Sequence, residues 1–176
     1  MSVVAKAAMQ HGRDWEGDDP TGWHVCEKLN GVRCYWDGAN AWSKEGNLIK
    51  LPPRIVRDMP EGLHRDGEIY AGRDGFEIAR SAVQYGRWKD DVHFVAFDAP
   101  HVEGDWLHRM ASLRSECRHV VSGYICESYA ELMDDLRRVQ ANGGEGLMIH
   151  SPLQTRYTPG RTSLLLKLKL VLPLLG

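Results

Sequence analysis

The stretch Glu27-Lys28-Leu29-Asn30-Gly31-Val32-Arg33 places a lysine at the end of one apolar strand pattern and an arginine near the start of the next. Asn30-Gly31 is a strong turn signal, because both residue types tolerate a positive φ. We therefore predict that Lys28 and Arg33 lie on adjacent strands joined by a tight hairpin. A lysine among other cations loses its proton more easily and can act as a nucleophile. Two solvated cations flanking an ordinary hairpin are the alternative for this stretch alone.

The composition is that of an ordinary globular protein in one domain, with 176 residues of which 43% are hydrophobic. The net charge of -2 argues against a strongly basic nucleic-acid binder, so any contact with nucleic acid must come from a local patch. Residues 1–10 do not have the pattern of a secretory signal. The apolar stretch 164–176 is shorter than the roughly 20 residues that span a bilayer. We expect a cytoplasmic protein without a membrane segment.

The cysteines and histidines show no metal-ligand spacing. Cys26, Cys34, Cys117 and Cys126 form no C-x-x-C pair, and the eight histidines contain no H-E-x-x-H pattern. Free thiols in a reducing compartment are therefore expected.

The pattern of apolar and turn residues predicts an α+β fold with antiparallel sheets flanked by helices. Residues 1–20 are expected to be an irregular lead-in, and the stretch 11–22 is rich in Gly, Asp and Pro. The predicted strands are 23–28, 32–36, 41–43, 67–71, 92–98, 146–150 and 163–170. The predicted helices are a short one between residues 52 and 59, then 76–85, 107–121 and 129–141.

Three further segments carry charged residues on predicted strands. Glu68 and Glu145 each stand at the start of a strand that follows a turn. Lys167 and Lys169 alternate with leucines, so they are expected to share one face of their strand. Two such lysines favour an anion between or above them, and polyphosphate together with a divalent cation fits this set. Each signal alone is more often structural, but their joint order is hard to obtain by chance.

That order resembles the covalent nucleotidyltransferases, which include ATP-dependent DNA ligases, RNA ligases and capping enzymes. The run 27–38 is similar to motif I of small bacterial ATP-dependent DNA ligases, which reads E-K-L-D-G-V-R-A-Y-W-D-G. Residues 66–68 and 95–98 look like motifs III and IIIa, and residues 145–150 and 165–169 look like motifs IV and V; Tyr157, Gly160 and Arg161 fit the approach to motif V. The resemblance covers about residues 8–169 and implies an adenylation domain of the covalent nucleotidyltransferase (ATP-grasp-like) kind.

The resemblance implies a role for each matching residue. Lys28 would attack the α-phosphate of ATP and hold AMP, which then passes to the 5′-phosphate of nicked duplex DNA before the 3′-hydroxyl displaces it. Glu27, Arg33, Glu68, Phe97, Lys167 and Lys169 would bind the nucleotide, and Glu68 and Glu145 would hold Mg²⁺ or Mn²⁺. Phe97 would stack on adenine, or it is a plain core aromatic; both interpretations stay open.

The sequence departs from this family in three places. Asn30 replaces the aspartate of the K-x-D-G pattern, which keeps the shape but loses the charge and puts the rate of the first step in question. Lys44 stands where these ligases carry a DNA-binding arginine, so the bidentate grip on phosphate is lost. Only seven residues follow Lys169, whereas the family continues into an OB-fold domain. We therefore expect that domain to be absent, DNA binding by this monomer to be weak, and a separate partner to be one possible source of the missing domain.

Three functions remain open from the sequence. ATP-dependent DNA ligation is the leading hypothesis, and the tails of motifs I and IV favour it. RNA ligation or capping within the same superfamily is the second hypothesis. A degenerate domain that binds nucleotide without catalysis is the third, supported by Asn30 and the missing OB fold. The biological role, whether in repair, replication or a phage cycle, is not indicated by the sequence.

Overall fold

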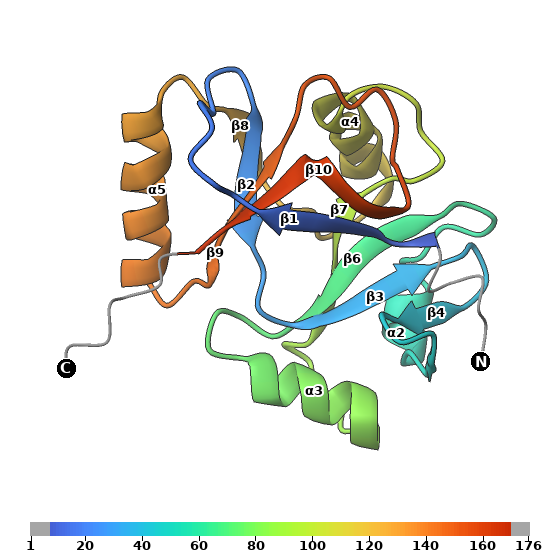
Figure 1. The fold of residues 1–176 in the computed structure, drawn as a ribbon. Helices are drawn as coiled ribbons and strands as arrows, with labels where there is room; N and C mark the ends of the chain where they lie inside the picture. The colour runs from blue at the N-terminus through green and yellow to red at the C-terminus, as the bar shows by residue number, and fades with distance from the viewer. Residues whose placement is uncertain (1–7, 170–176) are drawn as a thin grey trace.

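The computed structural model describes residues 8–169, which form two five-stranded sheets (Figure 1). The first sheet has the strand order β1-β10-β9-β2-β8, and the second has the order β5-β4-β3-β6-β7. Strands of the first sheet are β1 (Gln10–Asp14), β2 (His24–Lys28), β8 (Gly123–Ile125), β9 (Gly146–His150) and β10 (Gly160–Leu168). Strands of the second are β3 (Val32–Trp36), β4 (Ala41–Ser43), β5 (Leu48–Ile49), β6 (Arg65–Tyr70) and β7 (His93–Asp98). The predicted α+β class is confirmed.

In the part of the chain that the structure describes, four helices lie against these sheets: α2 (Pro53–Val56), α3 (Phe76–Tyr85), α4 (Trp106–Glu116) and α5 (Tyr129–Ala141). The Ser128 hydroxyl accepts a hydrogen bond from the backbone of Glu131 and so caps α5, whose predicted bounds are confirmed. The Asp105 carboxylate caps α4 in the same way, through the backbone of His108. Helix α4 ends at Glu116, earlier than predicted, because the following residues run beside β7 through bonds between Ala96 and residues 119 and 121.

The predicted hairpin between Lys28 and Arg33 is wrong. Strand β2 pairs with β8 and β9, whereas β3 pairs with β4 and β6, so the two strands belong to different sheets. Among the described residues, neither Asn30 nor Gly31 adopts a positive φ. A Cβ added at Gly31 would lie 2.3 Å from the carbonyl oxygen of Ile69. Glycine is therefore required there for a close approach to β6, and residues 29–31 form a crossing from one sheet to the other.

The expectation of an irregular lead-in is correct for residues 15–20 and wrong for residues 10–14. Residues 10–14 form β1, which pairs with β10 in parallel, from Gln10 opposite Gly160 to Asp14 opposite Lys167. Residues 1–7 of that expected lead-in, and residue 170 of the predicted last strand, lie outside the described residues. The strands of both sheets therefore pair antiparallel except at the edge formed by β1. There the backbone partners of β1 come from β10, near the other end of the chain.

Two apolar clusters stabilise the fold. One side of the first sheet packs against α5, with Val25, Leu132, Leu136, Leu147 and Ile149 fully buried. The other cluster joins the second sheet to α3 and α4 and includes Ile69, Ala79, Trp106, Met110 and Leu113. All four cysteines are free, and only Cys117 is partly exposed. Within residues 8–169, no helix is long and apolar enough to cross a bilayer.

Candidate nucleotide-binding cleft

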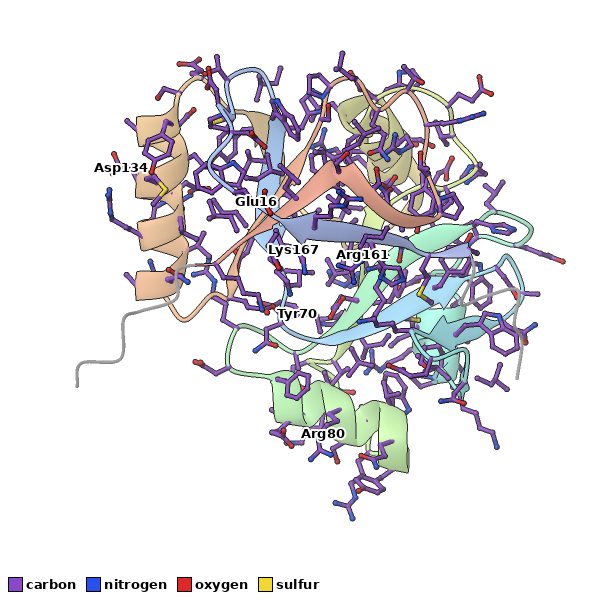
Figure 2. All side chains as sticks on the ribbon, viewed as in Figure 1. Glu16, Tyr70, Arg80, Asp134, Arg161 and Lys167 are labelled. Atoms are coloured by element: carbon purple, nitrogen blue, oxygen red, sulfur yellow. The ribbon has the colours of Figure 1, made fainter. Side chains whose placement is uncertain are left out.

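A cleft of about 600 Å³ lies between the two sheets, and both sheets contribute side chains to its walls. It is lined by six lysines and arginines, which are Lys28, Arg33, Lys44, Arg80, Arg161 and Lys167. Figure 2 shows Arg161 and Lys167 on β10 above the ribbon of β3, with Arg80 on α3 below it. Because positive charges gather in one concave site of this size, the cleft suits a polyanionic small molecule.

The Lys28 amine lies at the end of β2 and donates a hydrogen bond of 2.5 Å to Oε2 of Glu145. The other carboxylate oxygen of Glu145 accepts from Lys169. Burial alone would raise the pKa of Glu145, but the hydrogen bonds from these two lysines hold it below its ordinary value. The strand register explains the contact between Lys28 and Glu145, since Lys28 pairs with Gly146 on β9, next to Glu145. The structure therefore brings the predicted nucleophile and one predicted metal ligand into direct contact.

Glu68 lies on β6 across the cleft and accepts a hydrogen bond of 3.2 Å from the backbone N–H of Gly31. Burial raises the pKa of this carboxyl to about 7, against the opposing positive charges of Arg33 and Lys28. The charge of Lys28 therefore acts on both predicted acidic residues, Glu68 and Glu145. A carboxyl group that titrates near neutrality inside a cleft is typical of functional sites.

Arg33 is held rigidly by a carboxylate that sequence reasoning did not assign to the site. Its guanidinium donates two hydrogen bonds to Asp66, from Nε to Oδ1 at 2.6 Å and from Nη2 to Oδ2 at 2.5 Å. The hydroxyl of Tyr157 donates to Oδ2 of Asp66, also at 2.5 Å. The guanidinium carbon also lies 4.8 Å from the centre of the Phe97 ring, a cation–π distance. Phe97 lines the cleft, where one face of its ring is already occupied by Arg33.

Lys167 and Lys169, which were expected to share one face of their strand, pair with different carboxylates. Lys167 lines the cleft and forms an ion pair of 3.0 Å with Asp14 of β1. Lys169 follows the end of β10 and pairs with Glu145 instead. Because Glu145 also accepts a hydrogen bond from Lys28, Lys169 lies close to Lys28, with one carboxylate between the two amines.

The other two predicted residues also lie at the cleft. Lys44, in the turn between β4 and β5, is one of its lining residues. Glu27 lines it as well and accepts two hydrogen bonds from Arg73, at 2.9 and 2.8 Å. Arg73 belongs to the loop before α3, so this ion pair links the two sheets at one end of the cleft.

Sequence reasoning missed the inner wall of the cleft. Cys26 and His150 line it from β2 and β9, with 3.9 Å between Cys26 Sγ and His150 Nε2. The imidazole of His150 stacks on Trp106 of α4, with ring centres 4.3 Å apart. Burial lowers the pKa of His150 and raises the pKa of the Cys26 thiol, so both side chains are uncharged near neutral pH. Strand alternation could have indicated Cys26, because His24, Cys26 and Lys28 share one face of β2.

The carboxylates at the cleft could bind a magnesium ion only together with the phosphate oxygens of a bound nucleotide. Among the described residues there is no group of three or more His, Cys, Asp or Glu side chains that could hold a metal. Mg²⁺ in nucleotide sites is bound by one or two carboxylates together with phosphate oxygens and waters. Glu145 and Glu68, on either side of Lys28, match that requirement.

Together, the crossing between the sheets, the lysine at the end of β2 and the charged cleft make this domain similar to the nucleotidyltransferase domains of covalent DNA ligases. The chain is 29% identical over 157 residues to a DNA ligase of Haemophilus influenzae, a match that covers 84% of this chain. This chain spans 58% of the length of that relative. No family model matches the sequence.

Solved structures of DNA ligases have the same fold. A Lig E DNA ligase superposes with a TM-score of 0.81 at 29% identity, over 92% of this chain and 68% of that one. The Chlorella virus DNA ligase–adenylate gives 0.73 at 22% identity, covering 91% and 66% of the two chains. The ATP-dependent DNA ligase of bacteriophage T7, in complex with ATP, gives 0.63 at 16% identity, covering 95% and 70%. The predicted fold and the resemblance to small DNA ligases are confirmed.

Proposed function

We propose that this chain is the adenylation domain of an ATP-dependent DNA ligase. The observation that carries the proposal is the contact between Lys28 and Glu145 inside a cleft with further cations on both walls. The likeness to DNA ligases, at 29% identity in sequence and structure, supports the same conclusion.

In the first step the Lys28 amine attacks the α-phosphate of ATP. A bond forms between Nζ and phosphorus, the bond to the pyrophosphate oxygen breaks, and the amine gives up its proton. Lys28 must therefore leave its pairing with Glu145 as a neutral amine before it attacks. Arg33 and Lys167 hold the phosphates, Glu27 and Glu68 bind the nucleoside part, and Phe97 packs against adenine. Lys169 keeps the Glu145 carboxylate in place when Lys28 moves away.

Glu145 and Glu68 are the residues that would hold Mg²⁺ or Mn²⁺. The metal ion, when bound, neutralises negative charge that develops on the phosphate oxygens. Chelation of divalent cations is expected to prevent formation of the covalent adduct, and added Mg²⁺ is expected to restore it.

Transfer to nicked DNA completes the proposed reaction. The AMP passes to the 5′-phosphate at the nick, and attack by the 3′-hydroxyl then displaces AMP and seals the strand. Lys44, which lines the cleft, would contact this DNA. With a net charge of -2, the chain alone is expected to bind DNA weakly and as a monomer.

The first test uses ATP labelled at the α-phosphate. The wild-type chain is expected to acquire a covalent label between neutral and mildly alkaline pH, and Lys28→Ala is expected to remove it completely. Lys50→Ala is the matched control, because Lys50 is an exposed lysine that does not line the cleft. Thermal stabilisation by ATP without any covalent label would instead favour the nucleotide-binding domain without catalysis.

The choice of substrate separates the remaining alternative within the superfamily. Nicked duplex DNA is expected to be sealed in preference to nicked RNA, and ATP to be used in preference to GTP. Sealing of RNA nicks, or labelling by GTP, would replace DNA ligation with RNA ligation or capping.

A further inference from the structure

Tyr157 lies in the segment between β9 and β10, on the approach to motif V, and is 93% buried at the wall of the cleft. Its hydroxyl accepts a hydrogen bond of 2.6 Å from the backbone N–H of Gln10 and donates one of 2.5 Å to Asp66. A tyrosine hydroxyl has one proton to donate, and that proton is committed to the carboxylate of Asp66.

Asp66, held by the Tyr157 hydroxyl, in turn fixes the orientation of the Arg33 guanidinium. Both oxygens of the fully buried Asp66 carboxylate accept from the guanidinium, a bidentate arrangement that fixes its plane. Nη2 of Arg33 also donates to the carbonyl oxygen of Gln10 at 3.0 Å, which closes a ring of four residues. The ring joins β1, β3, β6 and the segment before β10, and so connects both sheets.

The orientation leaves one part of the guanidinium available. Nε and Nη2 of Arg33 are bound within the ring, and Nη1 has no hydrogen-bond partner within residues 8–169. Because Arg33 lines the cleft, a guanidinium fixed in this plane presents its unbound N–H groups to an anion there.

We propose that Tyr157 is a positioning residue for phosphate binding: its hydroxyl locks Asp66, which holds Arg33 in the orientation that grips a nucleotide phosphate. This inference rests on the proposed function for the identity of the ligand. It predicts that the Tyr157 hydroxyl increases the binding affinity only for ligands that carry phosphate, and that it does so only through Arg33.

The test measures ATP binding by calorimetry in chains that carry Lys28→Ala, so that no covalent step takes place. Tyr157→Phe removes only the hydroxyl and is expected to weaken ATP binding about tenfold to a hundredfold, since a hydrogen bond to a charged group contributes about 1.5–3 kcal/mol and 1.4 kcal/mol corresponds to a factor of ten. Binding of adenosine, which lacks phosphate, is expected to be unchanged. Tyr124→Phe is the matched control, because the Tyr124 hydroxyl also donates to a carboxylate, Asp135, away from the cleft.

A double-variant cycle separates positioning from general support of the fold. In an Arg33→Ala background, Tyr157→Phe is expected to have no further effect on ATP binding. Equal weakening of ATP and adenosine, or the same loss with and without Arg33, would overturn the proposal. If Tyr157→Phe fails to fold, Asp66→Asn interrupts the same relay and is expected to weaken ATP binding selectively; unchanged ATP affinity in that variant would also overturn it.

The outcome is independent of the covalent reaction. A wild-type chain that acquires the label, combined with unaltered ATP binding by Tyr157→Phe, would refute the positioning role and leave the ligase proposal intact. A chain that never acquires the label, but whose ATP binding depends on the Tyr157 hydroxyl, would refute the ligase proposal and leave the positioning role intact.

Discussion

At the scale of single residues, three of the positive charges that line the cleft are each accompanied by a specific carboxylate. Lys28 pairs with Glu145, Arg33 with Asp66, and Lys167 with Asp14. A bound triphosphate would compete with these carboxylates for the same cations. The cleft would therefore be organised before a nucleotide enters, and binding would exchange internal ion pairs for phosphate contacts.

The Glu68 carboxyl in the cleft titrates near neutral pH. We predict that this titration makes the stability of the fold depend on pH. The pKa of the Glu68 carboxyl is about 7 in the folded protein and has its ordinary value of 4.5 in the unfolded chain. The folded state binds the extra proton between these values, so the free energy of unfolding falls as pH rises from about 4.5 to 7 and levels off above 7. Glu68→Gln, which is always neutral, is expected to gain melting temperature relative to the wild type between pH 5 and pH 8.

The control for this pH series is Glu61→Gln, at an exposed position away from the cleft. Its melting temperature is expected to follow that of the wild type across the whole range. A constant difference between the wild type and Glu68→Gln from pH 5 to pH 8 would contradict a raised pKa.

Sequence motifs located most of the candidate site but not its supporting contacts. Lys28, Glu68, Arg33 and Lys167 line the cleft, since each lies in a local motif on a strand that borders it, and Glu145, just before β9, contacts Lys28. The partners of these side chains could not be predicted in the same way. Tyr157 reaches Asp66 over a separation of 91 residues, and no local periodicity encodes such a contact.

At the scale of elements, the crossing between β2 and β3 decides the geometry of the site. It carries the chain from one sheet to the other within residues 29–31, so Lys28 and Arg33 face the cleft from opposite walls. The crossing passes so close to β6 that the backbone of Gly31 donates to the Glu68 side chain.

We predict that Gly31→Ala disrupts this crossing. An added methyl group would lie 2.3 Å from the carbonyl oxygen of Ile69 and 2.7 Å from Cγ of Glu68, so backbone must move. Overpacking of this kind costs about 1–3 kcal/mol in the free energy of unfolding. Urea denaturation measures the loss, with Asn30→Ala at the exposed neighbouring position as the matched control. Equal stability of the two variants would show that the crossing tolerates a side chain.

The elements that depend on local signals were predicted well, and those that depend on distant pairing were not. Helix α5 matches its predicted bounds because Ser128 caps it and its apolar residues have helical spacing. Strand β1 was missed because its polar, glycine-containing sequence becomes a strand only by pairing with β10. The Asn30-Gly31 signal was misread because a close approach selects glycine as effectively as a turn does.

At the scale of the whole molecule, a ligand in the cleft would contact both sheets at once. Its walls include β1, β2, β9 and β10 from one sheet and β3, β6 and β7 from the other. The ion pair between Arg73 and Glu27 and the contacts of Arg33 already connect the sheets without a ligand's help. We therefore expect the two sheets to unfold together.

We predict that ATP stabilises the entire fold in one transition. At a concentration of 100 Kd, a ligand that binds only the folded state adds about 2.7 kcal/mol, which corresponds to about 5–10 °C in melting temperature for a chain of this size. Calorimetry with and without ATP measures the shift, and Asp134→Asn on the outer face of α5 is expected to leave it unchanged (Figure 2). Two separate transitions, or no shift, would contradict a shared site.

The placement of sulfur in the fold has a practical consequence for handling the protein. Thiols react with peroxides and alkylating reagents as thiolates, and burial raises the pKa of both Cys26 and Cys34. Cys117, the one cysteine with solvent access, is outside the walls that hold Lys28. Mild oxidants should therefore modify the chain at a site that leaves the amine intact, and a maleimide dye attached to Cys117 would report on the protein without blocking nucleotide entry.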